Sequence, residues 1–202
     1  MLIKSKPVPA ELRQIIAENL VVESNQQTLL ESMGGGGVAS EAKLSFPHQA
    51  YFMGLNDVAE GASLDAAYLT GTRVLLTDGQ NQIYSAAEVK QGAQKDRPVY
   101  FEDRPHLEPM LEGIERFTAR DSPARLMFKD LEMRLLRIPA LYVTAVWLHS
   151  EQQNVNLLMP VGTVYPPLEA YRVYNGTSFL ESLQAEAAQR LEQFNQDEDN
   201  NR

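Results

Sequence analysis

The stretch that most constrains the fold is the apolar run from Leu135 to Leu148. In an extended chain alternate side chains point to opposite faces, and here both faces are mostly apolar. Such a strand must be covered on both sides, so the run predicts a central strand of a sheet. Pro139 cannot donate a backbone hydrogen bond, which predicts a bulge or the start of the inner part of the strand. The side chains that we expect in the core are Leu141, Tyr142, Val143, Val146, Trp147 and Leu148.

Shorter strands are expected on either side of this run in the sequence. The segments 72–77 and 82–86 flank an Asp-Gly pair, which readily adopts the positive φ of a tight turn and therefore predicts a hairpin. Residues 98–102 alternate between apolar and polar side chains, which predicts a further strand. Residues 155–160 follow a polar loop and predict a second hairpin with the apolar run.

Four segments have the spacing of amphipathic helices. Residues 9–20 and 24–33 predict two N-terminal helices, and residues 107–117 predict a third, with Pro109 tolerated only in its first turn. The last helix is expected to begin with a capping box at Ser178 and to end near Asn195. The apolar stripe that we expect to pack on the sheet comprises Phe179, Leu183, Leu191 and Phe194.

The glycines at 34–37 mark the clearest boundary in the chain, because each glycine costs about 1 kcal/mol relative to alanine inside a helix. The sequence thus predicts an N-terminal helical appendage and glycine joint over residues 1–37, an α+β domain over residues 38–195, and a disordered polar tail over residues 196–202. Hairpins outnumber regular helical crossovers, so the expected fold is α+β, with a mixed or mainly antiparallel sheet and packed helices.

Charge and composition exclude several classes of function. The chain has 27 acidic and 18 basic residues and a formal net charge of −9, which disfavours contact with the phosphates of nucleic acids. It has no cysteine, so disulfides, thiol nucleophiles and cysteine-based metal sites are excluded. It also has no uninterrupted apolar run of about 18 residues and no apolar run near Met1 of the kind a signal peptide needs. We expect a cytoplasmic protein that neither spans nor binds a membrane.

Few residues are candidates for catalysis. His48, Asp57, Glu60 and Asp65 occur within one segment, and gathered around a pocket they would provide acid–base chemistry or hold a hard cation. The alternative is structural, since Asp57 is an ordinary helix cap and carboxylates are commonly solvated in an acidic protein. No histidine has a second histidine at the spacing that holds a metal on one side of a helix, so we predict no metal and no cofactor.

Three further residues are candidates for binding a ligand. Arg134 and Arg137 could bind a carboxylate or a phosphate, although arginines at such positions more often pair with nearby acidic residues. Tyr165 lies beside two prolines, where it is freer to face a partner than a tyrosine inside a strand.

These observations favour a non-enzymatic interaction or accessory module that binds a protein partner or associates with itself as a homodimer or other homo-oligomer. The amphipathic N-terminal segment is the expected docking element, and its apolar face either completes the core of its own chain or crosses to a neighbour. The alternative hypothesis is a small-molecule enzyme, a hydrolase or a metal-assisted enzyme with an acidic, histidine-containing pocket. Convergence of the four catalytic candidates in one cleft would favour the enzyme.

Overall fold

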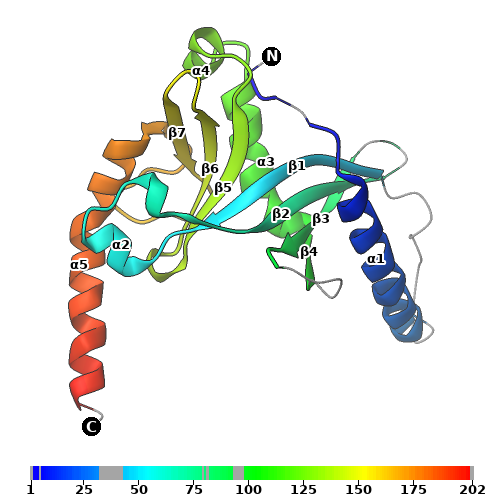
Figure 1. The fold of residues 1–202 in the computed structure, drawn as a ribbon, viewed down its shortest axis with the longest axis horizontal. Helices are drawn as coiled ribbons and strands as arrows, with labels where there is room; N and C mark the ends of the chain where they lie inside the picture. Colours follow the sequence, from blue (N-terminus) through cyan, green and yellow to red (C-terminus); the bar gives the residue numbers. More distant parts are fainter. Residues whose placement is uncertain are drawn as a thin grey trace. The chain divides into compact units, whose positions relative to one another are not determined.

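The computed structural model describes residues 2–4, 6–31, 43–78, 80, 82–92 and 98–200. Over these residues the fold is α+β, as predicted, with five α-helices and an eight-stranded mixed sheet (Figure 1). None of the helices in these ranges is both long and apolar enough to span a membrane. The elements in chain order are α1 (Ala10–Glu31), β1 (Lys43–Phe52), α2 (Leu55–Ala59), the 3₁₀ turn η1 (Leu64–Ala66), β2 (Tyr68–Thr77), β3 (Ile83–Lys90), β4 (Val99–Asp103), α3 (Arg104–Thr118), α4 (Pro123–Met127), β5 (Glu132–Ile138), the 3₁₀ turn η2 (Pro139–Leu141), β6 (Val143–Ser150), β7 (Val155–Pro160), β8 (Tyr174–Asn175) and α5 (Gly176–Asn200).

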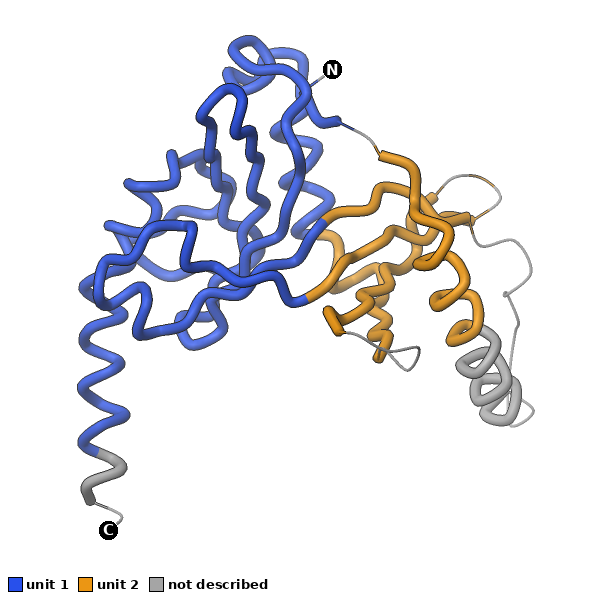
Figure 2. The backbone as a smooth tube through the Cα atoms, in the orientation of Figure 1, with its two compact units in different colours: residues 1–4, 49–70, 109–202 blue, residues 5–48, 71–108 orange. Residues whose placement is uncertain are grey.

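The strand order is β4-β3-β2-β1-β5-β6-β7-β8, and the sheet contains both parallel and antiparallel strand pairs. β1 pairs with β5 in parallel, whereas β2–β3, β3–β4, β5–β6, β6–β7 and β7–β8 are antiparallel. The chain divides into two compact units (Figure 2): unit 1 comprises residues 1–4, 49–70 and 109–202, and unit 2 comprises residues 5–48 and 71–108. The predicted joint at 34–37 lies outside the described residues.

The sheet strands of unit 1 are covered on both faces. On one face, side chains such as Leu136 and Trp147 share a core with Phe179 of α5 and Val58 of α2. On the other face, α3 approaches so closely at Gly113 that an added Cβ would lie 2.7 Å from Cγ1 of Val161. The apolar side chains on both faces of these strands are therefore explained, as predicted, by packing against both faces.

The apolar run is nevertheless two strands rather than one central strand. Leu135 pairs with Val146 across the antiparallel β5–β6 hairpin, and η2 forms the connection. Pro139 is the first residue of this 3₁₀ turn, where its missing N–H is not needed. Tyr142 ends the turn in the left-handed region, at φ 54°, and its side chain is 69% exposed, so its predicted place in the core is wrong. The other predicted core residues are buried: Leu141, Val143, Val146, Trp147 and Leu148.

Unit 2 contains α1, the first part of β1, the β2–β3–β4 meander and the start of α3. The predicted hairpin is confirmed, with Val74 opposite Ala87, and its turn is held by Asp78, whose Oδ1 accepts hydrogen bonds from the backbone N–H groups of Gln80 and Gln82 at 2.9 and 2.8 Å. Residues 99–103 form the predicted further strand. The apolar face of α1 packs on this meander and completes the core of its own unit, through Val8, Leu12, Ile15, Ile16, Val74, Leu76, Ala87 and Val89.

Several helices begin or end at other residues than the sequence predicts. α1 is one continuous helix from Ala10 to Glu31, with Ser24 in its interior rather than at the start of a second helix. α3 begins at Arg104, so Pro109 lies beyond the first turn. α3 continues through Pro109, although an interior proline removes one N–H donor and crowds the carbonyl oxygen one turn earlier.

α5 begins earlier than predicted and extends further. Asn175, not Ser178, caps it, since the N–H of Ser178 donates to Oδ1 of Asn175 at 2.8 Å. Phe179 and Leu183 are buried as expected, but Phe194 is 57% exposed, so the predicted stripe does not pack along its whole length. The last turns of α5 continue away from the sheet strands of unit 1 to Asn200 (Figure 1), past the predicted end of the helix.

Candidate functional site

Unit 1 contains a cavity of about 670 Å³ at the N-terminal end of α5. The α2–η1 connection, the β6–β7 turn, the start of β7 and the first turns of α5 line it. Its polar lining consists of carboxylates, side-chain amides and hydroxyls, and no lysine, arginine or histidine of the described chain lines it. The polar lining residues are Glu60, Asp65 and Glu181, then Asn154, Asn156, Asn175 and Gln184, and finally Ser63 and Thr177.

Two glycines bring the walls of this cavity together. A Cβ on Gly176, the first residue of α5, would lie 2.7 Å from Cδ1 of Leu64 in η1 and 3.1 Å from Cβ of Asn156 in β7. Only a residue without a side chain allows α5 to begin so close to both elements. Gly61, which follows Glu60, has φ 74° and turns the chain from α2 towards η1.

The amide of Asn156 is fixed by two cross-strand neighbours. Its Oδ1 accepts hydrogen bonds from Nε1 of Trp147 at 2.9 Å and from Nδ1 of His149 at 2.8 Å. These two donors identify the oxygen of the side chain and restrict its rotation. Asn175, which caps α5, is also held by a backbone N–H. The cavity therefore has at least two preorganised amides.

The four predicted catalytic residues do not all belong to this cavity. Glu60 and Asp65 line it, and the Ser63 hydroxyl donates to Oδ2 of Asp65 at 3.1 Å. Asp57 instead accepts a hydrogen bond from the N–H of Gly54 at 3.1 Å and so serves the start of α2, as the structural alternative predicts. His48 is buried in unit 2, with Nδ1 3.0 Å from the carbonyl oxygen of Phe46. Within the described ranges, no three histidine, aspartate or glutamate side chains form a group that could hold a metal ion.

The three predicted ligand-binding residues lie apart as well. Arg134 and Arg137 are separated by an odd number of positions on β5 and therefore occupy opposite faces of the sheet. The guanidinium of Arg134 lies against two rings that contact each other edge to face, 5.2 Å from the centroid of Tyr51 and 4.8 Å from that of Trp147. Tyr165 is exposed in the connection after β7 and does not line the cavity.

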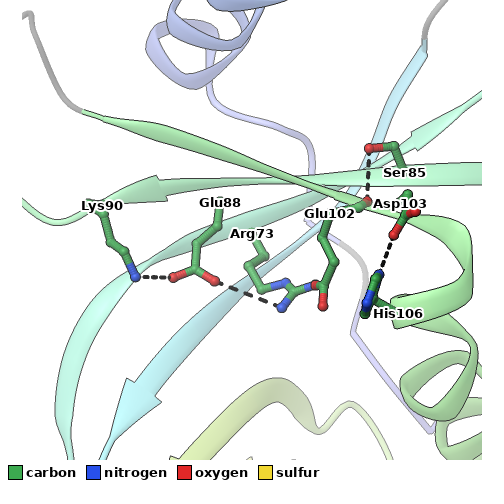
Figure 3. A network of polar contacts seen from close by, with 7 residues as sticks. All are labelled: Arg73, Ser85, Glu88, Lys90, Glu102, Asp103 and His106. Atoms are coloured by element: carbon green, nitrogen blue, oxygen red, sulfur yellow. Dashed lines mark hydrogen bonds and ion pairs between the residues drawn. The ribbon is translucent and has the colours of Figure 1, made fainter.

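Unit 2 holds a network of charged side chains that the sequence reasoning missed (Figure 3). Arg73 of β2 forms ion pairs with Glu88 of β3, at 3.8 Å, and with Glu102 of β4. Lys90 donates to Glu88 at 2.7 Å. Arg73 and Glu88 are both buried. Buried charges of this kind are stable only with their partners in place, so the network has a structural role in the meander.

His106 and Asp103 form an exposed hydrogen-bonded pair at the start of α3 (Figure 3). This hydrogen bond, together with the negative charge of Asp103, raises the pKa of His106 above 6.5. The raised pKa means that the pair stabilises the fold at pH values below the unfolded pKa and that this contribution is lost as the pH rises through the folded pKa.

In the Asp103→Asn variant we expect the pKa of His106 to fall back towards 6.5, measured from the imidazole proton shifts in an NMR titration. The unmodified protein, titrated under the same conditions, is the reference. An unchanged titration of His106 in the variant would contradict the assigned cause.

The lining of the cavity is chemically complementary to a cationic, hydrogen-bonding group. Carboxylates accept hydrogen bonds and attract positive charge, whereas each side-chain amide both donates and accepts. Its residues come from distant parts of the sequence, and the local signals were the acidic candidates Glu60 and Asp65 and the Asn-Gly pair at 175–176, which is typical of a turn. No protein-family model matches the chain, and no curated protein or solved structure matches it either.

Proposed function

We propose that the protein is a non-enzymatic binding module that holds a basic segment of a partner protein in the cavity at the N-terminal end of α5. The observation that carries this proposal is the lining of three carboxylates, Glu60, Asp65 and Glu181, with no basic side chain among the described residues beside them. Carboxylates that share a cavity repel one another, and a bound cation relieves that repulsion.

The remaining lining favours a polypeptide over a simple amine. Four side-chain amides face the same cavity, and their paired donors and acceptors match those of peptide groups. The volume of about 670 Å³ lies within the range of roughly 300–1,000 Å³ that is usual for ligand sites, and it exceeds the space that one lysine side chain needs. A short segment with lysine or arginine fits both requirements. The net charge of −9 would also increase the rate of encounter with a basic partner.

Self-association is a separate proposal. The N-terminal segment was its expected docking element, but the apolar face of α1 is used inside unit 2. Light scattering on the intact protein measures the oligomeric state directly, and a monomer would rule out self-association without bearing on the cavity.

The test of the cavity uses a model basic segment, the tripeptide acetyl-Lys-Lys-Lys-amide, with acetyl-Gln-Gln-Gln-amide as the uncharged comparison. We expect calorimetry to show saturable binding of the lysine peptide. In a variant with Glu60→Gln, Asp65→Asn and Glu181→Gln the affinity should fall at least about tenfold, because three charge pairs of roughly 0.5–1 kcal/mol each are lost.

The control removes the same net charge elsewhere in unit 1, through Glu115→Gln, Asp121→Asn and Glu192→Gln, which are exposed and do not line the cavity. It should bind the lysine peptide as the unmodified protein does. Equal weakening in the two triple variants would show attraction to the overall negative charge only and would overturn the proposal.

A further inference from the structure

A second cavity, of about 300 Å³, lies in unit 1 beside the β6–β7 turn and the start of β5. It carries charges of both signs. Its ionisable lining residues are Lys4, Asp130, Glu132, Arg134, His149 and Glu151. No residue lines both this cavity and the one at the N-terminal end of α5. The two cavities are adjacent at one cross-strand pair, because His149 lines this cavity and its partner Asn156 lines the other.

The side chain of Arg134 is the most unusual group in this cavity. It is only 15% exposed, and its buried Nε finds no hydrogen-bond acceptor within the part of the chain that the structure describes. The nearest carboxylate oxygen, Oε2 of Glu132, is 3.6 Å from Nη2, beyond hydrogen-bond distance. The rings of Tyr51 and Trp147, which contact each other edge to face, both lie against the guanidinium and leave its Nε without an acceptor.

Two other arginines show how a stacked guanidinium is usually satisfied in this protein. Arg172 lies over the ring of Tyr174 and donates to Glu169 at 2.5 Å. Arg190 lies over Tyr142 and donates to the carbonyl oxygen of Ala140 at 2.9 Å. Arg134 has the ring contacts, but its ion pair with Glu132 is long, at 3.6 Å, and its Nε has no acceptor among the described residues. A carboxylate entering the cavity would supply a closer acceptor for the guanidinium, since its planar fork matches two carboxylate oxygens.

The acidic residues in the cavity indicate that the ligand also has a positively charged group. A simple anion in this cavity would be attracted by Lys4 and Arg134 but repelled by the three carboxylates of Asp130, Glu132 and Glu151. A ligand with an ammonium group beside its carboxylate would be attracted by both sets of charges. The volume is at the low end of the range for ligand sites, roughly 300 Å³ and upwards, which suits one small molecule rather than a peptide.

We propose that this cavity binds a free α-amino acid, with its carboxylate on Arg134 and its ammonium group between Asp130 and Glu151. The recognised groups are the backbone groups common to all amino acids, so L-alanine is a sufficient probe. Propionate and ethylamine are its matched halves, because each keeps one of the two charges and nearly the same size.

Trp147 is the sole tryptophan of the chain and stacks on Arg134, so its fluorescence reports on the cavity. We expect L-alanine to change this fluorescence in a saturable manner, and propionate and ethylamine to have little effect at the same concentrations. Calorimetry on the same samples should give the same dissociation constant. An absence of alanine binding, or equally strong binding of propionate, would overturn the proposal.

Two variants assign the site. Arg134→Lys removes the fork and keeps the charge, and Asp130→Asn removes one carboxylate at a position with φ 54°, which asparagine tolerates well. Each should weaken alanine binding at least tenfold, whereas Arg172→Lys should not. If the melting curve of Arg134→Lys shows that this variant does not fold, the Asp130→Asn variant still tests whether alanine binds in this cavity. Unchanged binding in Asp130→Asn would contradict the assignment of the ammonium group.

The two binding proposals can be tested independently of each other. The variant with Glu60→Gln, Asp65→Asn and Glu181→Gln leaves the second cavity intact, so it should bind L-alanine normally even where lysine-peptide binding is lost.

Discussion

The Val143→Asp variant is expected to lose more than about 4 kcal/mol of its free energy of unfolding, because it buries a charge with no partner. Val143 begins β6, is 5% exposed and belongs to the core cluster that joins the sheet of unit 1 to α5. Aspartate cannot keep its hydration there. Chemical denaturation followed by circular dichroism measures the loss.

The neighbouring residue provides a matched control. Tyr142 is exposed and has φ 54°, a conformation that aspartate adopts more readily than tyrosine does. Tyr142→Asp introduces the same charge one position earlier and loses only the stacking of Arg190 on the ring. We expect a change within about 1 kcal/mol. Similar losses of free energy in the two variants would contradict the burial of Val143 and the exposure of Tyr142.

The Arg73→Met variant is expected to lose about 3–5 kcal/mol, because it removes one partner of a buried ion pair in unit 2. Glu88 stays buried with its contact to Lys90, and Glu102 loses its arginine (Figure 3). Adding Glu88→Leu to Arg73→Met should recover part of the loss, since the buried carboxylate that has lost its arginine is then gone as well. Equilibrium denaturation of the single and double variants gives the coupling energy.

Arg104→Met is the comparison for that network. Arg104 also pairs with a glutamate in unit 2, Glu108, at 3.6 Å, but both side chains are largely exposed. Exposed pairs contribute about 0–1 kcal/mol, so this variant should melt close to the unmodified protein. A loss in Arg104→Met as large as that in Arg73→Met would show that burial is not what makes the network important.

The sequence predicted the fold class and most of the elements because both depend on local patterns. The hairpin turn at Asp78 and the buried face of Phe179 and Leu183 followed from turn chemistry and periodicity. The apolar run around Pro139 shows the limit. One long buried strand and two buried strands joined by a short turn have the same pattern, and only the average strand length of about five to six residues favours the second.

The candidate sites could be predicted only in part. Glu60 and Asp65 were identified as acidic candidates, but nothing in the sequence places Glu181 or Asn156 beside them, since tertiary packing brings these residues together. Arg134 was identified as a ligand-binding candidate from its residue type. Its stacked and poorly satisfied guanidinium depends on cross-strand register, which no local pattern determines.

The most direct test of the proposed function is an NMR titration of the ¹⁵N-labelled protein with acetyl-Lys-Lys-Lys-amide. We expect saturable shifts of four side-chain NH₂ signals, all with one dissociation constant equal to that from calorimetry. These signals belong to Asn154, Asn156, Asn175 and Gln184. The NH₂ group of Asn19, which bonds to the carbonyl oxygen of Ile15 within α1, should not move. Shifts spread over exposed acidic segments, with the four cavity amides unchanged, would contradict binding of the lysine peptide in this cavity.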